Sequence, residues 1–346
     1  IGCSKGMDRN LVETAIGPNG NKSADAFKGI PSGKLRRYFS WKNFVDVFKI
    51  GSGFFASFFI LLKEKPSVLF SKGGFVSVPP CIAAKILHIP VYTHECDYSP
   101  GLATRINAKS ANRILVSFSE TKKFFSEEKQ KFVTITGNPI RPVFYTPDFS
   151  VGRQFLGLQN REEKPVLLIL GGSSGARQVN QLVFDNLEWL CQHFIVVHQT
   201  GKGENFDNAL QYKEKLGSLE NNYKPYAFIY GEMPHVMSAS DVVLSRSGSN
   251  SLWECAVEGK PLVLIPLCGS GTRGDQVENA EFFRKQKAAF VMNGDEANSE
   301  NLKNYLLQMT DEEIRKRYST ASRTIAGNLK PAIVIATILK DEVLEK

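Results

Sequence analysis

Two glycine-rich segments carry residue types that suit the binding of a phosphate group. They are residues 171–177, which read GGSSGAR, and residues 72–79, which read KGGFVSVP. Glycine lets a backbone approach a ligand closely, and the N–H groups at the start of a helix attract an anion. The first segment has neither the GxGxxG spacing of dinucleotide sites nor a following GKS or GKT. Each segment can also be a plain tight turn, but two of them together favour a bound ligand.

Two further segments carry side chains that suit hydroxyl groups. Glu254 stands about two turns into a helix expected after an apolar run, and its carboxylate can accept two hydrogen bonds from vicinal hydroxyls such as those of a ribose. Gln276 and Asn279 share one face of the next predicted helix, where a pair of amide groups suits a sugar. A solvated helix face is the alternative interpretation for all three residues.

A third group, His94, Glu95 and Asp97, closes a predicted strand. Ligands of open α/β sheets bind at the carboxyl ends of strands, so these groups are candidates for a general base or for orienting a nucleophile. A structural histidine is the alternative. No HxH or HxxxH pair accompanies His94, and no CxxC occurs, so the sequence predicts no metal site. The six scattered cysteines argue against a disulfide framework and suit a reducing cytosol.

Basic and aromatic residues alternate over residues 34–62, beginning with Arg36, Arg37, Trp41 and Lys42. Such a segment is typical of a helix lying on an anionic membrane surface, and a buried helix is the alternative. Its longest apolar run covers 13 residues, whereas a membrane span needs about 20. No nucleic-acid motif is present, so we expect no nucleic acid as a partner.

The net charge of +8 is confined to the first part of the chain. Residues 1–150 hold 21 Lys and Arg against 11 Asp and Glu, whereas residues 151–346 hold 22 against 24. An anionic partner of the first part follows from this asymmetry. The first residue is not Met and no signal peptide is visible, so we expect that an N-terminal segment is absent.

Short apolar runs alternate with helical patterns in both halves, which predicts parallel sheets covered by helices on both faces. A length of 346 residues suits about two domains, and we expect two Rossmann-like ones. Prolines interrupt the chain near residues 139–150, where the boundary should fall, and residues 331–339 should form a final helix. The expected strands lie at residues 68–71, 91–93, 114–116, 133–135, 166–170, 194–197, 242–244 and 262–265.

Taken together, these motifs resemble the MurG family of bacterial glycosyltransferases, along the whole chain. The segments that carry the resemblance are residues 32–39, 70–79, 137–141, 171–177, 246–250 and 274–276. The resemblance implies an α/β GT-B fold with two Rossmann-like domains, 1–146 for the acceptor and the membrane and 147–330 for a UDP-sugar. It also implies that a helix at 331–346 returns to the first domain.

The family activity would be an inverting transfer of N-acetylglucosamine from UDP-N-acetylglucosamine to the 4-hydroxyl of undecaprenyl-diphospho-N-acetylmuramoyl-pentapeptide (lipid I), a step of peptidoglycan synthesis. The resemblance requires no cofactor and no metal. It implies a peripheral protein on the cytoplasmic face of the bacterial cell membrane.

The resemblance also distributes roles over residues. The donor would be bound by Arg141 and by six residues of the UDP-sugar domain, Ser173, Tyr230, Ser249, Glu254, Gln276 and Asn279. Within that set, the Ser173 loop would hold the diphosphate, the main chain near Tyr230 the uracil and Glu254 the ribose. In the first domain the acceptor would meet Gly73, Gly74, Ser77 and Asp97, with Glu95 as the general base and His94 beside it.

Two departures from the family pattern leave alternatives open. The family's opening loop, rich in glycine and containing a histidine, has no counterpart in residues 1–346, and that histidine competes with Glu95 for the role of base. Asp97 stands where the family often has Asn. The alternatives are another UDP-sugar enzyme of GT-B fold, such as a glycolipid synthase or an epimerase, or a fragment that binds a UDP-sugar without turnover.

Overall fold

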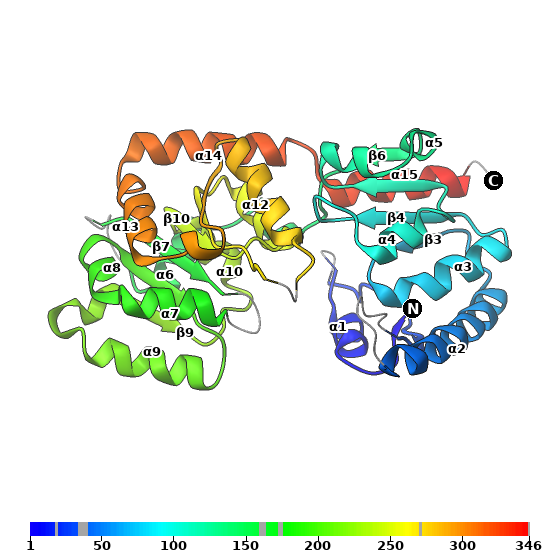
Figure 1. Cartoon of the computed structure of the whole chain (residues 1–346), viewed down its shortest axis with the longest axis horizontal. Helices are drawn as coiled ribbons and strands as arrows, with labels where there is room; N and C mark the ends of the chain where they lie inside the picture. The colour runs from blue at the N-terminus through cyan, green and yellow to red at the C-terminus, as the bar shows by residue number, and fades with distance from the viewer. Residues whose placement is uncertain (18–19, 34–40, 159–163, 172–175, 270–271, 345–346) are drawn as a thin grey trace. The chain divides into compact units, whose positions relative to one another are not determined.

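The computed structural model describes the chain except residues 18–19, 34–40, 159–163, 172–175, 270–271 and 345–346, and leaves the side chains of 41–47 undescribed. It divides into two compact units (Figure 1). The first unit combines residues 1–139 with 329–346, and the second comprises residues 140–328. The boundary expected after residue 146 therefore falls inside the second unit.

The first unit is built on a parallel sheet of four strands, in the order β3-β4-β5-β6. The strands are β3 (Leu69–Ser71), β4 (Val91–Glu95), β5 (Arg113–Val116) and β6 (Val133–Ile135). All four were expected from apolar runs. Two short strands, β1 (Gly2–Cys3) and β2 (Gly29–Ile30), form a separate parallel pair that the sequence did not predict.

The first unit also contains helices, several of which pack against this sheet. They are α1 (Asp8–Thr14), α2 (Trp41–Glu64), η1 (Phe75–Ser77), α3 (Val78–Ile86), α4 (Leu102–Asn107), η2 (Ser119–Phe124), α5 (Glu127–Gln130) and α15 (Pro331–Leu344). Leu61 of α2 lies in one core with Cys81 and Ala84 of α3 and Val91 of β4. The last helix, α15, is fixed to the sheet because the Tyr92 hydroxyl donates to a Glu342 carboxylate oxygen at 2.7 Å.

The second unit contains six parallel strands in the order β12-β11-β10-β7-β8-β9. They are β7 (Val166–Leu170), β8 (Ile195–Gln199), β9 (Tyr223–Tyr226), β10 (Val242–Ser245), β11 (Leu262–Leu264) and β12 (Ala289–Val291). The chain adds strands on one side of β7, then crosses to its other side for β10. This is the Rossmann order, and its point of reversal between β7 and β10 is where such sheets bind ligands.

The helices of the second unit cover both faces of the sheet. They are η3 (Pro142–Tyr145), α6 (Phe149–Phe155), α7 (Arg177–Asp185), α8 (Leu187–His193), α9 (Glu204–Glu214), η4 (Gly217–Asn222), α10 (Met233–Ser238), α11 (Ser249–Glu258), α12 (Asp275–Lys285), η5 (Gly294–Glu296), α13 (Ser299–Gln308) and α14 (Glu312–Ala326). Asp148 caps α6 and Asp311 caps α14 through backbone N–H groups. The two-domain α/β architecture with parallel sheets is confirmed.

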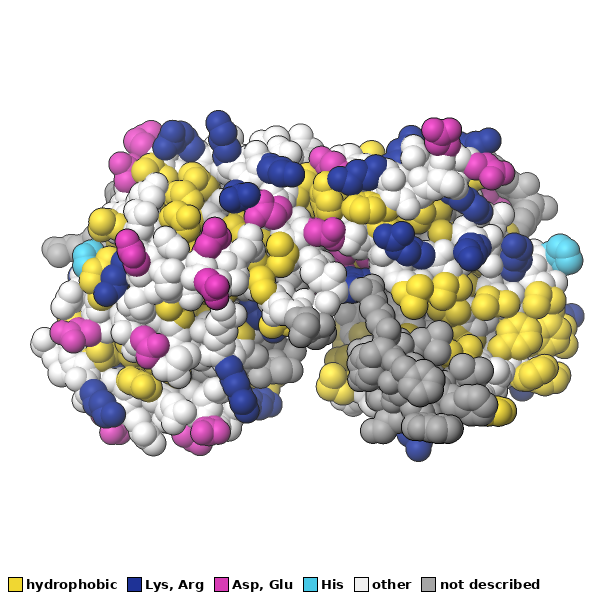
Figure 2. All heavy atoms as spheres, in the orientation of Figure 1, with side chains coloured by type: hydrophobic (Ala, Val, Ile, Leu, Met, Phe, Trp, Pro, Cys, Tyr) yellow, Lys and Arg dark blue, Asp and Glu magenta, His cyan; other side chains and the backbone are white. Residues whose placement is uncertain are grey.

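Exposed apolar side chains gather over α2 and α3 of the first unit (Figure 2). Phe48, Phe55, Phe59 and Leu62 of α2 are 69%, 61%, 64% and 48% exposed. Their spacing places all four on one side of the helix. The neighbouring side of α2 packs into the core through Phe54, Phe58 and Leu61. Among the described residues, no helix is both long and apolar enough to cross a membrane.

Candidate functional site

The candidate donor residues of the second unit lie on loops at the carboxyl edge of its sheet. The loop after β7 begins at Gly171, but Ser173 lies outside the described residues. The loop after β10 leads through Ser247 and Gly248 into α11, where Ser249 is buried as the first helical residue. Both loops flank the reversal point of the strand order, which is the expected position of a nucleotide site.

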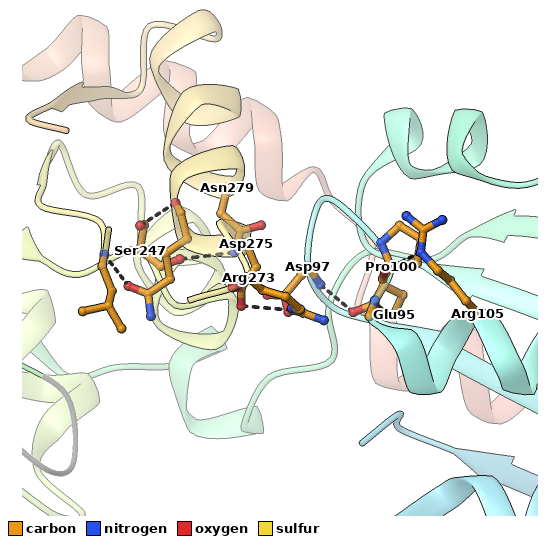
Figure 3. A network of polar contacts seen from close by, with 11 residues as sticks. Glu95, Asp97, Pro100, Arg105, Ser247, Arg273, Asp275 and Asn279 are labelled. Atoms are coloured by element: carbon orange, nitrogen blue, oxygen red, sulfur yellow. Dashed lines mark hydrogen bonds and ion pairs between the residues drawn. The ribbon is translucent and has the colours of Figure 1, made fainter. Parts of the chain in front are cut away.

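Hydrogen bonds join the loop after β10 to the start of α12 (Figure 3). The Ser247 hydroxyl donates to the main-chain oxygen of Gln276 at 2.7 Å, and the Asn279 amide donates to the Ser247 main-chain oxygen at 3.2 Å. The Gln276 side-chain oxygen accepts from the Leu267 N–H at 3.0 Å and from Arg246 Nε at 3.3 Å. Gln276 and Asn279 therefore hold these loops together, and the Gln276 NH₂ group makes no hydrogen bond within the described part of the chain.

Glu254 of α11 faces Arg141, with 3.4 Å between Oε1 and Nε. The Glu254 side chain is 17% exposed, and this burial raises the pKa of its carboxyl group, whereas the Arg141 guanidinium lowers it. The Arg141 side chain also lies over the Phe144 ring, 4.8 Å from its centre. The structure thus joins two residues that the sequence placed near the same donor.

Tyr230 lies in the loop after β9, on the same edge of the sheet, and is 59% exposed. Its ring contacts Phe228, with 4.5 Å between the ring centres. The N–H of the neighbouring Ile229 donates to Oε1 of Gln199, the last residue of β8, at 2.9 Å. Gln199 fixes this loop, and the sequence interpretation did not single it out, because nothing in the local pattern shows which loop a buried glutamine holds.

In the first unit, Lys72 and His94 form a connected network at the carboxyl edge of the sheet. Lys72 Nζ lies 3.1 Å from His94 Nδ1 and donates to Asn138 Oδ1 at 3.4 Å. His94 Nε2 lies 3.0 Å from the Gly137 main-chain oxygen. Because an ammonium only donates, His94 accepts at Nδ1 and carries its hydrogen on Nε2.

Burial, reinforced by Lys72, lowers the pKa of His94 to about 3. Both of its ring nitrogens are occupied and the side chain is fully buried. These contacts favour a structural role for His94, which is to hold the Lys72 turn and the segment at residues 137–138.

Glu95 is buried, and each of its carboxylate oxygens accepts a main-chain N–H, from Asp97 at 3.1 Å and from Gly101 at 3.0 Å. The Asp97 contact is drawn in Figure 3. Candidate metal-ligating atoms of Glu95, Cys96 and Asp97 lie within 4.8 Å of one another. Burial lowers the pKa of the nearby Lys72 ammonium, and Cys96, Glu95 and Asp97 oppose this effect.

The glycine turn before α3 is held by a residue that the sequence interpretation missed. Gly73 and Gly74 have φ of +81° and +78°, a conformation that favours glycine. The Ser77 hydroxyl donates to the Gly74 oxygen at 2.7 Å, and Asn107 Nδ2 donates to the Ser77 hydroxyl oxygen at 2.8 Å. Asn107 of α4 is a fully buried amide. Burial is known only from the structure, so nothing in the local sequence marked Asn107 as the residue that holds this turn.

The expected membrane residues are only partly visible. Arg36 and Arg37 lie outside the described residues, and Trp41 and Lys42 begin α2 without described side chains. The exposed apolar side of α2 is described from Phe48 onward.

Comparison with known proteins matches both units to one family. Residues 12–116 match the glycosyltransferase family 28 N-terminal domain, and residues 166–334 match its C-terminal domain. A protein of Treponema denticola named UDP-N-acetylglucosamine–N-acetylmuramyl-(pentapeptide) pyrophosphoryl-undecaprenol N-acetylglucosamine transferase is 50% identical over 350 residues, covering 98% of this chain and 88% of that protein. The chain belongs to the MurG family. It is therefore a hexosyltransferase of glycosyltransferase family 28.

Solved structures agree with the fold of the MurG family. The crystal structure of Acinetobacter baumannii MurG has a TM-score of 0.68 at 22% identity, covering 90% of this chain and 84% of that chain. A Staphylococcus aureus MnaA–UDP co-structure has a TM-score of 0.62 at 13% identity, covering 84% and 80%. The GT-B fold expected from the motifs is confirmed.

Proposed function

We infer that the chain transfers N-acetylglucosamine from UDP-N-acetylglucosamine to undecaprenyl-diphospho-N-acetylmuramoyl-pentapeptide, as its family does. The observation that carries this inference is the 50% identity with a transferase of that name over 98% of the chain. The acceptor 4-hydroxyl attacks the anomeric carbon, the bond from that carbon to the UDP oxygen breaks with inversion, and the hydroxyl proton passes to a base.

Product analysis tests this function directly. The chain is incubated with UDP-N-acetylglucosamine and a lipid I analogue, and we expect a disaccharide-linked lipid and one UDP per transfer. Isomerisation of the nucleotide sugar without acceptor would instead identify an epimerase. Calorimetric binding of UDP with no product would identify a binding fragment without turnover.

The second unit is our proposed donor site. Glu254 suits the ribose because its carboxylate accepts from paired hydroxyls, and the exposed Arg141 beside it suits the diphosphate. The NH₂ group of Gln276, together with Asn279 and Ser249, suits the sugar, and the loop of Tyr230 suits the uracil. The N-terminus of α7, which follows the loop of Ser173, would stabilise the departing diphosphate.

The first unit is our proposed acceptor site, with Gly73, Gly74, Ser77 and Asp97 on its carboxyl edge. Glu95 remains our candidate base. Each Glu95 oxygen accepts one main-chain N–H and retains a second lone pair for a hydroxyl proton. His94, next to Glu95, would hold the Lys72 turn and residues 137–138 in place.

The base assignment is tested with Glu95→Gln, which keeps the side-chain shape. We expect kcat to fall by about 10²–10⁴-fold, the usual contribution of a general base, with UDP affinity unchanged. Turnover near the level of the unmodified protein would exclude Glu95 from this role. Glu128→Gln, at an exposed glutamate of α5, is the matched control and should leave kcat unchanged.

We further propose that the first unit attaches peripherally to the cytoplasmic face of the cell membrane. The exposed apolar side of α2, following the basic segment at residues 34–42, has the composition of an interfacial helix. Cations near an anionic leaflet contribute about 1 kcal/mol each, so the basic segment and the apolar side would act together.

Vesicle sedimentation tests the attachment. The double variant Phe55→Ser and Phe59→Ser should lose most binding to anionic vesicles, because both side chains are exposed on one side of α2. Charge reversal at Arg36, Arg37 and Lys42 should have a similar effect. Leu307→Ser, at an exposed leucine of the second unit, is the control, and an equal loss there would contradict the proposed surface.

A further inference from the structure

An aromatic cluster with two cations lies beside the proposed acceptor loop of the first unit. The Tyr98 ring contacts Phe118 and Phe124, with 5.8 Å and 6.0 Å between ring centres. Lys123 Nζ lies 4.8 Å from the centre of the Tyr98 ring and 5.2 Å from that of Phe124. The Arg105 guanidinium lies 5.9 Å from the centre of the Phe124 ring. Two positive charges thus share one aromatic surface.

Hydrogen bonds fix the members of this cluster in place. The Tyr98 main-chain oxygen accepts from the Thr121 hydroxyl at 2.8 Å, and the Tyr98 hydroxyl accepts from Lys123 at 2.9 Å. Arg105 Nε donates to the Pro100 oxygen at 3.0 Å (Figure 3). Arg105 is an exposed residue, and its two terminal nitrogens make no hydrogen bond within the described part of the chain. A preordered guanidinium with free terminal N–H groups is the form that binds a carboxylate through two parallel hydrogen bonds.

The position of the cluster links it to the acceptor. Tyr98 follows β4 and Phe124 belongs to η2, which follows β5, so both stand at the carboxyl ends of adjacent strands. This is the edge at which open parallel sheets bind ligands. The cluster is contiguous with Glu95 and Asp97, because Glu95 Oε2 accepts the Gly101 N–H at the end of the same loop.

We propose that Arg105 and Lys123, on the ring surface of Tyr98 and Phe124, bind a carboxylate of the peptide carried by the acceptor. The inference rests on the proposed function, which supplies a peptide-bearing substrate. A peptide attached through its amino end keeps a free carboxylate, which suits an arginine fork, while its apolar side chains suit the rings. The acceptor diphosphate is a different anion, for which the glycine turn at residues 73–74 is our candidate instead.

Steady-state kinetics with two acceptors test the proposal. One acceptor carries the pentapeptide, and the other is the same diphosphate-linked N-acetylmuramoyl lipid without the peptide. For Arg105→Ala and for Lys123→Ala we expect KM for the peptide-bearing acceptor to rise about tenfold, the loss of one charge-assisted hydrogen bond. The KM for the peptide-free acceptor and for UDP-N-acetylglucosamine should not change. Lys109→Ala, at an exposed lysine beyond α4, is the matched control.

Conservative variants keep the test decisive. Lys123→Arg retains the charge, so its KM should equal that of the unmodified chain. Tyr98→Phe removes only the hydroxyl that accepts from Lys123. An equal rise in KM for both acceptors would assign the cations to the diphosphate and overturn the proposal. Unchanged kinetics with both acceptors would exclude the cluster from acceptor binding. Absence of transfer by the unmodified chain would instead contradict the proposed function.

Discussion

Glu258 at the end of α11 is a buried carboxyl group with no hydrogen-bond partner for either oxygen among the described residues. Burial raises its pKa to about 8; Glu254 adds to this effect, and Lys260 opposes it. A carboxyl group in an unfolded chain titrates near 4.5. Protonation of Glu258 therefore favours the folded state, and this stabilisation is complete below pH 4.5 and is lost as the pH rises through 8.

Glu258→Gln should consequently make the second unit more stable than the unmodified protein at pH 8–9, by about 1–3 kcal/mol, the cost of a buried group without a partner. The difference should shrink as the pH falls toward 5. Urea unfolding at several pH values measures it, with Glu214→Gln on the exposed end of α9 as the control. Stability curves that run parallel across this pH range would contradict the prediction.

Arg141 and Glu254 allow a second prediction at the scale of a residue pair. The proposed contact with the ribose hydroxyls needs an ionised Glu254, and Arg141 lowers the pKa that burial raises. Arg141→Met removes this counter-charge, so the pKa of Glu254 should rise. As the pH is lowered, UDP affinity should therefore begin to fall at a higher pH in this variant than in the unmodified protein. Calorimetry with UDP between pH 5 and 8 checks this shift. Arg284→Met, which removes an exposed guanidinium of α12, should leave the pH profile unchanged.

At the scale of elements, the contact between α6 and α10 depends on Gly152. A Cβ atom added at this position would lie 1.9 Å from the His235 main-chain oxygen, which is far inside van der Waals contact. Gly152→Ala should therefore push the two helices apart and destabilise the second unit by about 1–3 kcal/mol, the usual cost of overpacking. Thermal unfolding measures this loss. Gly231→Ala adds a Cβ with no atom within 4 Å and should change little.

The strands that the sequence predicted contain short apolar runs. β7 is buried and apolar at every residue, so its character was visible without the fold. β4 is buried throughout as well, but it ends in the polar residues His94 and Glu95, and the sequence predicted only its first part, residues 91–93. β9 was missed because its sequence, Tyr-Lys-Pro-Tyr, contains a proline and a cation and reads as a turn. The two-residue strands β1 and β2 are too short for any periodicity. Contacts between residues far apart in the chain decide which strands pair, so these remaining strands were recognised only in the structure.

The candidate site was predictable to the level of loops but less so to the level of atoms. Glycine turns and polar helix starts marked the segments after β3 and β10 correctly as turns at strand ends, whereas residues 172–175 after β7 and 270–271 after β11 lie outside the described residues. The sequence did not show that the Gln276 side-chain oxygen is used by Leu267, or that Lys72 bonds to His94. Such partners are separated along the chain, so only the folded arrangement identifies them.

For the whole molecule, the division of charge follows the division into units. The excess of 21 Lys and Arg over 11 Asp and Glu in residues 1–150 lies almost wholly in the first unit, which also carries the exposed apolar side of α2. The second unit, within the nearly neutral remainder, holds the proposed nucleotide-sugar site. The basic first unit thus has the charge that suits its proposed partner, an acceptor held at an anionic membrane surface.

The first unit is completed by a chain segment that follows the second, and this makes a prediction about the whole molecule. Ile335 of α15 is 4% exposed, and Glu342 accepts the Tyr92 hydroxyl of β4. Truncation after Asn328 removes these contacts. It should lower the temperature at which the first unit unfolds, or abolish that unfolding transition. The second unit, which ends at Asn328, should keep its own transition and bind UDP within about twofold of the full chain.

Differential scanning calorimetry and UDP titration measure the two parts of this prediction, and point variants show which contacts matter. Tyr92→Phe deletes a hydrogen bond to a charged group and should destabilise the first unit by about 1.5–3 kcal/mol. Ile335→Ala removes a buried side chain and should cost about 2–5 kcal/mol. Ile333→Ala, at a residue of the same helix that is 60% exposed, should cost little. Loss of UDP binding on truncation would contradict the independence of the second unit, because α15 makes these contacts in the first.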